Sequence, residues 1–280
     1  MNVNRREQVL SGESKYTYPK NYFRIQVDFA KKVNDLGITN NFSEALVDYT
    51  SLYRRVTGVK MAKGEALSPK WEGLVSEFQE KEVDPFLATE KIWQSYTDEP
   101  KNIYHPEEVV ENKTHFGAFI GKDGIDGESG EQKIELHYND KYRGMIKDSF
   151  TREKIEERRG DLKRMFTKIK ERMDEDENYR PKWVSLGSWI NTFSIVKRCL
   201  PDEFVATEKF LTPPDLSFKG DSIWGQFINS EGEINQERSG SFLNKVQEAK
   251  NLDELVAAFP VKVSYFRGPI EIFFKEYGIN

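Results

Sequence analysis

The chain has 280 residues, and its 42 Lys and Arg residues against 47 Asp and Glu residues give a net charge of -5 at neutral pH. This acidic balance argues against nucleic acid as the main partner, because the phosphate backbone selects proteins with a basic surface. The length allows one large domain or two ordinary ones, and no stretch is apolar for long enough to suggest a membrane span.

The first hundred residues are predicted to be helical. Their aromatic and aliphatic residues recur every three or four positions, and a glycine follows each of the first two apolar stripes. We assign residues 1–100 to a helical N-terminal region, which forms either a separate domain or a layer packed on the sheet that follows. The four apolar stripes that predict its helices cover residues 22–36, 42–56, 71–78 and 86–93.

The pattern changes between residues 98 and 112, where we place the soft boundary of this region. Residues 115–120 and 133–138 alternate apolar with other side chains, as the strands of a β-hairpin do. Residues 121–132 between them are rich in glycine and acidic side chains, so we expect a polar, mobile connector.

Strands and helices then alternate to the end of the chain. This rhythm predicts an α+β domain with a mixed or antiparallel sheet and flanking helices over residues 112–280. Its longest helix is expected over residues 151–173, where one apolar stripe runs along a densely charged segment. Further strands are expected over residues 183–187, 204–210, 222–228 and 261–266, and further helices over residues 190–199, 235–249, 252–258 and 270–277.

Two histidines occupy matching positions in the predicted hairpin. We expect the imidazoles of His115 and His137 on one face of the sheet, with Glu135 beside His137. A carboxylate next to an imidazole fixes its tautomer and raises its basicity, which a general base needs. His137, Glu135 and His115 are therefore the candidate catalytic residues. The alternative is a solvated sheet face whose polar residues carry no chemistry.

A strand-to-helix corner is predicted at Gly187 and Ser188. The Ser188 hydroxyl can cap the helix that follows, or the free amides at that helix start can hold an anionic or carbonyl group of a ligand. On the second interpretation Gly187, Ser188 and Trp189 contact substrate. Trp224 and Gln226, in the segment WGQF, are further substrate-binding candidates, with core packing as the alternative for both tryptophans.

Several kinds of site have no signature in the chain. The three histidines are not part of an HExxH motif and no CxxC motif occurs, so we expect no metal site. No Walker loop and no GxGxxG motif is present to bind phosphates. The single cysteine, Cys199, excludes an intrachain disulfide, and the N-terminus has no apolar leader, so we expect a cytoplasmic protein.

Several segments together resemble a family of uncharacterised bacterial proteins of about this length, and that resemblance brings no activity with it. They include YFRIQVDFA, HFGAF, IELHYND, RRGDLKRMF, LGSWINTFSIVKRCLPDEF and IWGQFINSEGEI.

Four short motifs, taken in chain order, also resemble the C-terminal part of GNAT-like acyltransferase domains. They are Leu136-His137 on a strand, Met165-Phe166 on a helix, Ser188-Trp189 after a strand and Leu200-Pro201 after a helix. This resemblance implies a GNAT-like fold, acyl transfer to an amine or hydroxyl, and acyl-CoA as the donor. The Gly-rich turn of the type Q/R-x-x-G-x-G/A, which is the acyl-CoA signature of that superfamily, is not found in the chain.

Two functions from different classes remain open at this point. The first is an acyltransferase acting on a small molecule or a protein, with a cleft between the hairpin and the corner at Ser188. The second is a non-catalytic binding or interaction protein. Its aromatic N-terminal helices would form a groove or a homo-oligomer surface, and its acidic segment 121–132 would contact a basic partner.

Overall fold

The chain belongs to the α+β class, as predicted. It folds into two compact units. The helical unit comprises residues 1–105 and 212–260, and the sheet unit comprises residues 106–211 and 261–280. Residues 212–260 fall inside the predicted α+β domain of residues 112–280, yet they belong to the helical unit. The computed structural model describes residues 18–59, 65–78, 83–98, 115–138, 150–229 and 232–280.

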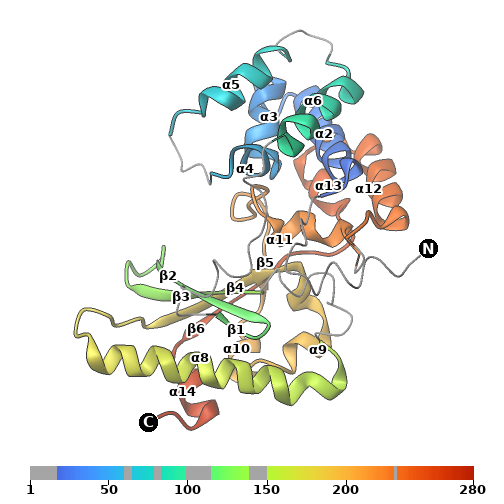
Figure 1. Cartoon of the computed structure of the whole chain (residues 1–280). Coiled ribbons are helices and arrows are strands. Elements are labelled where there is room, and N and C mark those ends of the chain that lie inside the picture. The colour runs from blue at the N-terminus through green and yellow to red at the C-terminus, as the bar shows by residue number, and fades with distance from the viewer. Residues whose placement is uncertain (1–17, 60–64, 79–82, 99–114, 139–149, 230–231) are drawn as a thin grey trace, which may run out of the picture. The chain divides into compact units, whose positions relative to one another are not determined.

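The helical unit forms around α2 (Lys20–Asp35), whose apolar residues are almost completely buried. Figure 1 shows the later helices α12 and α13 beside the N-terminal ones, although more than a hundred residues separate them in the chain. The other helices of this unit are α3 (Phe42–Asp48), α4 (Leu52–Thr57), α5 (Pro69–Ser76), α6 (Pro85–Thr97), α11 (Asp221–Trp224), η5 (Gly225–Phe227), α12 (Gln236–Glu248) and α13 (Leu252–Ala257).

The apolar stripe over residues 42–56 folds as two helices, α3 and α4, rather than one. Gln26 on α2 is completely buried, and its side-chain oxygen accepts hydrogen bonds from both the backbone N–H (2.8 Å) and the hydroxyl (3.0 Å) of Ser51. A buried amide needs such partners, and the N–H that it binds is withdrawn from the helical ladder. Gln26 therefore interrupts the helix at a point where the apolar pattern continues.

An aromatic cluster joins residues 212–260 to α2. The Phe29 ring centroid lies 5.4 Å from that of Trp224 and 5.8 Å from that of Phe242. The strand predicted over residues 222–228 is wrong, because α11 and η5 occupy this segment. A helical turn brings Trp224 and Phe227 to the same side, with centroids 6.1 Å apart, whereas a strand would place them on opposite faces.

The sheet unit is built on six strands in the order β1-β2-β3-β4-β6-β5. Strands β3 and β4 are parallel and the other neighbours are antiparallel. Parallel neighbours need a crossover connection, which the long helix α8 (Ile155–Glu175) supplies. The strands are β1 (His115–Phe116), β2 (Phe119–Ile125), β3 (Gln132–Tyr138), β4 (Trp183–Ser188), β5 (Lys209–Phe210) and β6 (Ser264–Pro269).

The segment between β4 and β6 differs from the prediction. The helix expected over residues 190–199 consists of a 3-10 turn, η4 (Trp189–Thr192), and the short helix α9 (Ser194–Lys197). The strand expected over residues 204–210 is wrong for its first half, which is the helical turn α10 (Asp202–Val205). Phe204 explains that turn, because its buried ring packs on Phe266 and Phe273.

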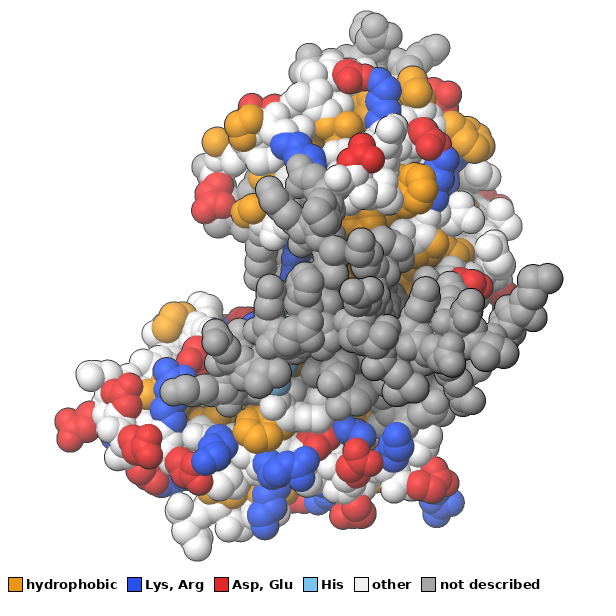
Figure 2. Space-filling model, in the orientation of Figure 1, with side chains coloured by type: hydrophobic (Ala, Val, Ile, Leu, Met, Phe, Trp, Pro, Cys, Tyr) orange, Lys and Arg blue, Asp and Glu red, His pale blue; other side chains and the backbone are white. Residues whose placement is uncertain are grey.

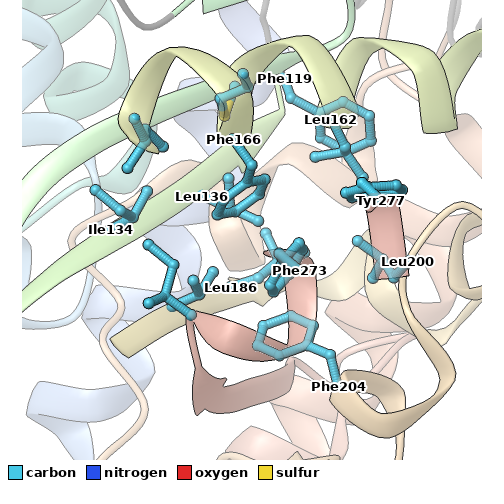
Figure 3. Packing of buried hydrophobic residues seen from close by; sticks show 14 of the residues in the cluster. Phe119, Ile134, Leu136, Leu162, Phe166, Leu186, Leu200, Phe204, Phe273 and Tyr277 are labelled. Carbon is cyan, nitrogen blue, oxygen red and sulfur yellow. The ribbon is translucent and has the colours of Figure 1, made fainter. Parts of the chain in front are cut away.

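The core of the sheet unit lies between the sheet and its helices. Phe166 of α8 stacks on Phe273 of α14 (Glu271–Tyr277) with ring centroids 4.2 Å apart, and Leu136 and Leu186 lie close to them (Figure 3). The outer side of α8 carries intermixed acidic and basic side chains (Figure 2). This division gives α8 the apolar and charged sides that its sequence predicts.

Side chains alternate between the two faces of the sheet along every strand. The register places Phe119, Leu136, Leu186 and Phe266 on one face, where they enter the core. We call the opposite side the polar face. Its residues include His115, Ile120, Lys122, Gly124, Lys133, Glu135, His137, Trp183, Ser185, Gly187, Lys209, Tyr265 and Arg267.

Half of the predicted connector over residues 121–132 is strand. β2 continues to Ile125 and β3 begins at Gln132, so the turn between them is short. Asp126 organises this turn by accepting hydrogen bonds from the backbone N–H and the hydroxyl of Ser129, both at 2.9 Å. The prediction of a mobile loop is replaced by a hairpin with a side-chain-braced turn.

Candidate functional site

His115 and His137 face the same side of the sheet, as expected, but they do not lie on paired strands. The segment predicted as one strand over residues 115–120 reverses at Gly117 and forms β1 and the start of β2. His115 on β1 pairs with Ile120 on β2, and Ile120 pairs with His137 on β3. Residues directly opposite each other on neighbouring strands point to the same face. His115 and His137 therefore share the polar face, but β2 separates them, and Ile120 stands between the two imidazoles.

Glu135 and His137 form a carboxylate–imidazole pair on this face. The two residues are two positions apart on β3, and His137 Nε2 lies 3.8 Å from Glu135 Oε2, an ion-pair distance. Lys133 Nζ approaches the same carboxylate at 2.9 Å. His137, and after it Lys133, lower the pKa of Glu135 to about 2. The carboxylate therefore stays ionised at neutral pH and can hold the proton of His137 on Nε2.

This pair is accessible, because the side chains of His137 and Glu135 are 45% and 38% exposed. The carboxylate that carries a pKa of about 2 is too weak a base to remove a proton itself. The imidazole is the group of the pair that can do so, with Glu135 orienting it.

The turn between β2 and β3 extends across the polar face as far as β6. Asp126 is 2% exposed and accepts two hydrogen bonds from Arg267 of β6, from Nε at 2.9 Å and from Nη2 at 2.7 Å. The Arg267 guanidinium also lies 3.7 Å from the ring centroid of Trp183, whose indole N–H donates to Glu131. Because β6 lies two strands beyond β3, these contacts require the turn to bend over the polar face.

Arg267 holds the pKa of Asp126 far below its usual range. The acidic side chains of the segment 121–132 are thus paired within the chain: Asp126 with Arg267, Glu131 with Lys182, and Asp123 with Arg172. A basic partner protein would have to compete with these ion pairs.

Ser188 is a capping residue, in agreement with the structural interpretation of the sequence. Its hydroxyl accepts a hydrogen bond of 3.2 Å from the backbone N–H of Ile190 at the start of η4. It pairs with Ser264 of β6 and lies on the core side of the sheet, opposite to the two histidines. The Ser188 hydroxyl therefore does not share a face with the two imidazoles, and a cleft that combines them is not found on this side of the sheet.

Gly187 and Trp189 flank Ser188 in different surroundings. Gly187 is aligned with Tyr265 on the polar face, where a side chain at this position would first meet the Tyr265 ring at 3.4 Å. Trp189 is buried in a small cluster with Ile190 and Val196. Of the three corner residues, only Gly187 belongs to the face that carries His137.

Trp224 and Gln226 belong to the helical unit and are completely buried there. The indole N–H of Trp224 donates to the Phe218 carbonyl at 2.8 Å, and the Gln226 amide donates to the Ile223 carbonyl at 2.8 Å. Both contacts are those of residues that hold a core together, which the sequence analysis gave as the alternative for Trp224.

Most residues of the polar face were not singled out from the sequence as site candidates, among them Ser185, Lys122 and Arg267. Ser185 is aligned with Glu135 on one side and with Arg267 on the other. The alternation along β4 would have placed Ser185 on the face opposite to Val184 and Leu186. The alignment with Glu135 could not be foreseen, because it depends on a parallel pairing that the sequence does not specify.

A shallow hollow of about 380 Å³ lies between the β2–β3 hairpin and the C-terminal end of α8. Its polar groups are engaged with one another: Tyr179 Oη and Arg172 Nη1 both donate to Asp123, each at 2.7 Å. His137 and Glu135 do not line it. We therefore take the polar face, and not this hollow, as the candidate site.

Comparison of the chain with models of known protein families, with curated proteins and with solved structures yields no match. Within the described ranges, no helix is both long and apolar enough to cross a membrane. Among the same residues, no group of three or more His, Cys, Asp and Glu side chains could hold a metal ion.

Proposed function

We propose that the sheet unit is an acyltransferase of the GNAT-like kind, acting on an amine or hydroxyl of a small molecule or a protein. The observation that carries the proposal is the accessible pair of His137 and ionised Glu135 on the polar face. In addition, the motifs Leu136-His137, Met165-Phe166 and Ser188-Trp189 fall on β3, on α8 and at the end of β4, in the order of the resemblance.

In this proposal His137 is the general base. Glu135 faces Nε2, so the neutral imidazole carries its proton there and keeps the lone pair of Nδ1. Nδ1 then takes the proton of the attacking amine or hydroxyl as the new bond to the acyl carbon forms. General base catalysis of this kind contributes about 10²–10⁴-fold to a rate.

The basic residues of the polar face suit acyl-CoA as the donor, because its phosphate groups are negatively charged. Lys122, Lys133 and Lys209 stand on the polar face, and lysine ammonium groups bind phosphate oxygens as point charges. Acyl-CoA would supply an activated thioester. A cytoplasmic location is part of the proposal, since the chain has one cysteine and so no intrachain disulfide.

The test combines binding with thiol release. Isothermal titration of the protein with acetyl-CoA is expected to give heat, and release of free CoA thiol in the presence of mixed amines is expected to fall by about 10²–10⁴-fold in His137→Ala. His115→Ala is the matched control, because it removes an imidazole from the same row but two strands away from Glu135. Absence of both heat and thiol release would end the proposal.

A protein-interaction module is the second candidate, and one observation favours it. Phe86 and Leu87, at the start of α6, are 73% and 54% exposed. Large apolar side chains exposed next to each other are frequent in contact surfaces. If they mediate homo-oligomers, sedimentation should reveal an assembly that Phe86→Ser/Leu87→Ser converts to monomers. A wild-type protein that is monomeric at every concentration would exclude this.

A further inference from the structure

Two acidic side chains of the β2–β3 turn contact Arg267, and they are held very differently. Asp126 is buried, and its carboxylate accepts hydrogen bonds from Nε and Nη2 of Arg267 at 2.9 and 2.7 Å. The Glu128 side chain is 63% exposed, with Oε2 at 3.3 Å from Arg267 Nη1 and Oε1 at 3.6 Å from Lys209 Nζ. Charge-assisted hydrogen bonds are shorter, about 2.7–2.9 Å. Glu128 is therefore a loosely held carboxylate that bridges two cations.

The Arg267 guanidinium is fixed before any ligand arrives. Asp126 holds two of its nitrogens, and the ring of Trp183 stacks on it with 3.7 Å between the guanidinium carbon and the ring centroid. The third nitrogen, Nη1, is the one that lies near Glu128. A donor that its neighbours already hold in place loses little conformational freedom when it binds a ligand. Arg267 Nη1 and Lys209 Nζ thus form a prearranged pair of donors for an anion.

The lengths of the two Glu128 contacts indicate which anion would fit better. A carboxylate offers two oxygens and a single charge, and Glu128 uses one oxygen for each cation without coming close to either. A phosphate group offers three acceptor oxygens and up to two negative charges. It is larger, so it can approach both donors at the same time. Arginine and lysine are also the side chains that most often bind phosphate.

We propose that Arg267 and Lys209 form a binding site for a phosphate group of a small-molecule ligand, and that Glu128 occupies this site in its absence. An incoming phosphate displaces the Glu128 carboxylate, while Asp126 keeps the turn attached to Arg267. The turn is then an internal competitor of the ligand. This inference goes beyond the proposed function, because anion binding at β5 and β6 needs no acyl transfer.

The test is isothermal titration of the full-length protein with inorganic pyrophosphate at low ionic strength, where charges are weakly screened. Glu128→Gln is expected to lower the Kd about two- to fivefold, since it removes a competing exposed ion pair. Lys209→Met is expected to raise the Kd about tenfold, since it removes one of the two charged donors. The side chains of Glu128 and Lys209 are 63% and 57% exposed, so neither change should disturb folding.

Glu131→Gln is the matched control. It makes the same change of charge in the same turn, but the Glu131 carboxylate pairs with Lys182 at 2.6 Å and not with Arg267 or Lys209. The Kd of this variant should stay at the wild-type value. If Glu131→Gln lowers the Kd as much as Glu128→Gln does, pyrophosphate responds to overall charge and the site is overturned.

Two further outcomes decide the inference. Malonate, a dicarboxylate, should bind more weakly than pyrophosphate, and tighter binding of malonate would refute phosphate as the ligand group. Absence of heat with pyrophosphate in both the wild type and Glu128→Gln overturns the site altogether. Neither result bears on the proposed function, which is tested separately by acetyl-CoA and His137→Ala.

Discussion

Glu135 lies in an environment that departs clearly from that of a free side chain. Two basic neighbours on its own strand, His137 and Lys133, stabilise the ionised carboxylate and lower its pKa to about 2. The pKa of Glu135 is lower in the folded chain than in the unfolded chain. The ionised carboxylate therefore stabilises the fold at pH values above about 4.3, the ordinary glutamate pKa. That contribution is lost as the pH falls from there toward 2.

This electrostatic coupling can be measured at the residue itself. In a carbon-13 NMR titration the Glu135 carboxyl is expected to change at a pH of about 2, and His137→Ala should raise the midpoint because the first of its two basic neighbours is gone. Lys133→Met should raise it less. His115→Ala, two strands away, should leave it unchanged. A midpoint that does not respond to His137→Ala would mean that the two side chains do not interact.

At the scale of single residues, the sequence identifies side chains with suitable chemistry better than it identifies the face of the sheet on which they lie. The alternation over residues 133–138 is enough to place His137 and Glu135 on one face. Along β4, alternation places Ser188 on the same face as Leu186. The pairing of Ser188 with Ser264 shows that this is the core face, opposite to His137. Only the cross-strand pairing decides which of Ser185, Gly187 and Ser188 shares a face with His137.

Between elements, one polar contact fixes the β1–β2 turn on α8. Asp161 of α8 is buried, its Oδ2 accepts a 3.3 Å hydrogen bond from the Ala118 N–H, and Arg158 Nη1 lies 2.5 Å from the same oxygen. Gly117 has a φ of +53°, and a Cβ at this position would lie 2.0 Å from Asp161 Oδ2. The segments HFGAF and RRGDLKRMF therefore meet in the fold through Gly117 and Asp161.

This contact predicts a difference between two glycines. Gly130 also has a positive φ, +72°, but nothing lies within 4 Å of a Cβ built on it. Gly130→Ala should therefore cost only the backbone penalty of about 1–2 kcal/mol. Gly117→Ala should cost about 1–3 kcal/mol more, because Asp161 must move. Urea unfolding of both variants measures the difference, and equal losses would show that Asp161 yields without cost.

The misassigned elements share a physical cause. The segments 204–210 and 222–228 are short and carry large apolar residues, and such segments fit a buried strand as well as a helical turn. Tertiary contacts decide between the two. Phe204 packs on Phe266 and Phe273, and Trp224 and Phe227 both enter the aromatic cluster around Phe29. The long helix α8 needs no such help, since its stripe extends over many turns.

At the scale of the whole chain, the sheet unit is interrupted by residues 212–260, which belong to the helical unit. The sheet closes across this interruption. Lys209 and Phe210 of β5 pair with Tyr265 and Ser264 of β6, and the Leu211 N–H donates to the Val263 carbonyl at 2.9 Å. The two ends of the sheet unit at the interruption are therefore as close as the two sides of a hairpin.

This closure predicts that the sheet unit tolerates excision of the interruption. A chain that starts at residue 106 and joins residue 211 to residue 261 through a short Gly-Asn turn should fold, because β5 and β6 then form an ordinary hairpin. The N-terminal helices without residues 212–260 should not fold, because Phe29 loses the rings of Trp224 and Phe242.

Circular dichroism and thermal unfolding of both fragments measure these outcomes. A cooperative transition is expected for the joined sheet unit and none for residues 1–105. The joined unit should also keep the low Glu135 midpoint, since His137 and Lys133 travel with it. A joined unit that unfolds without cooperativity would mean that the sheet depends on the helical unit for its stability, and that the polar face exists only in the intact chain.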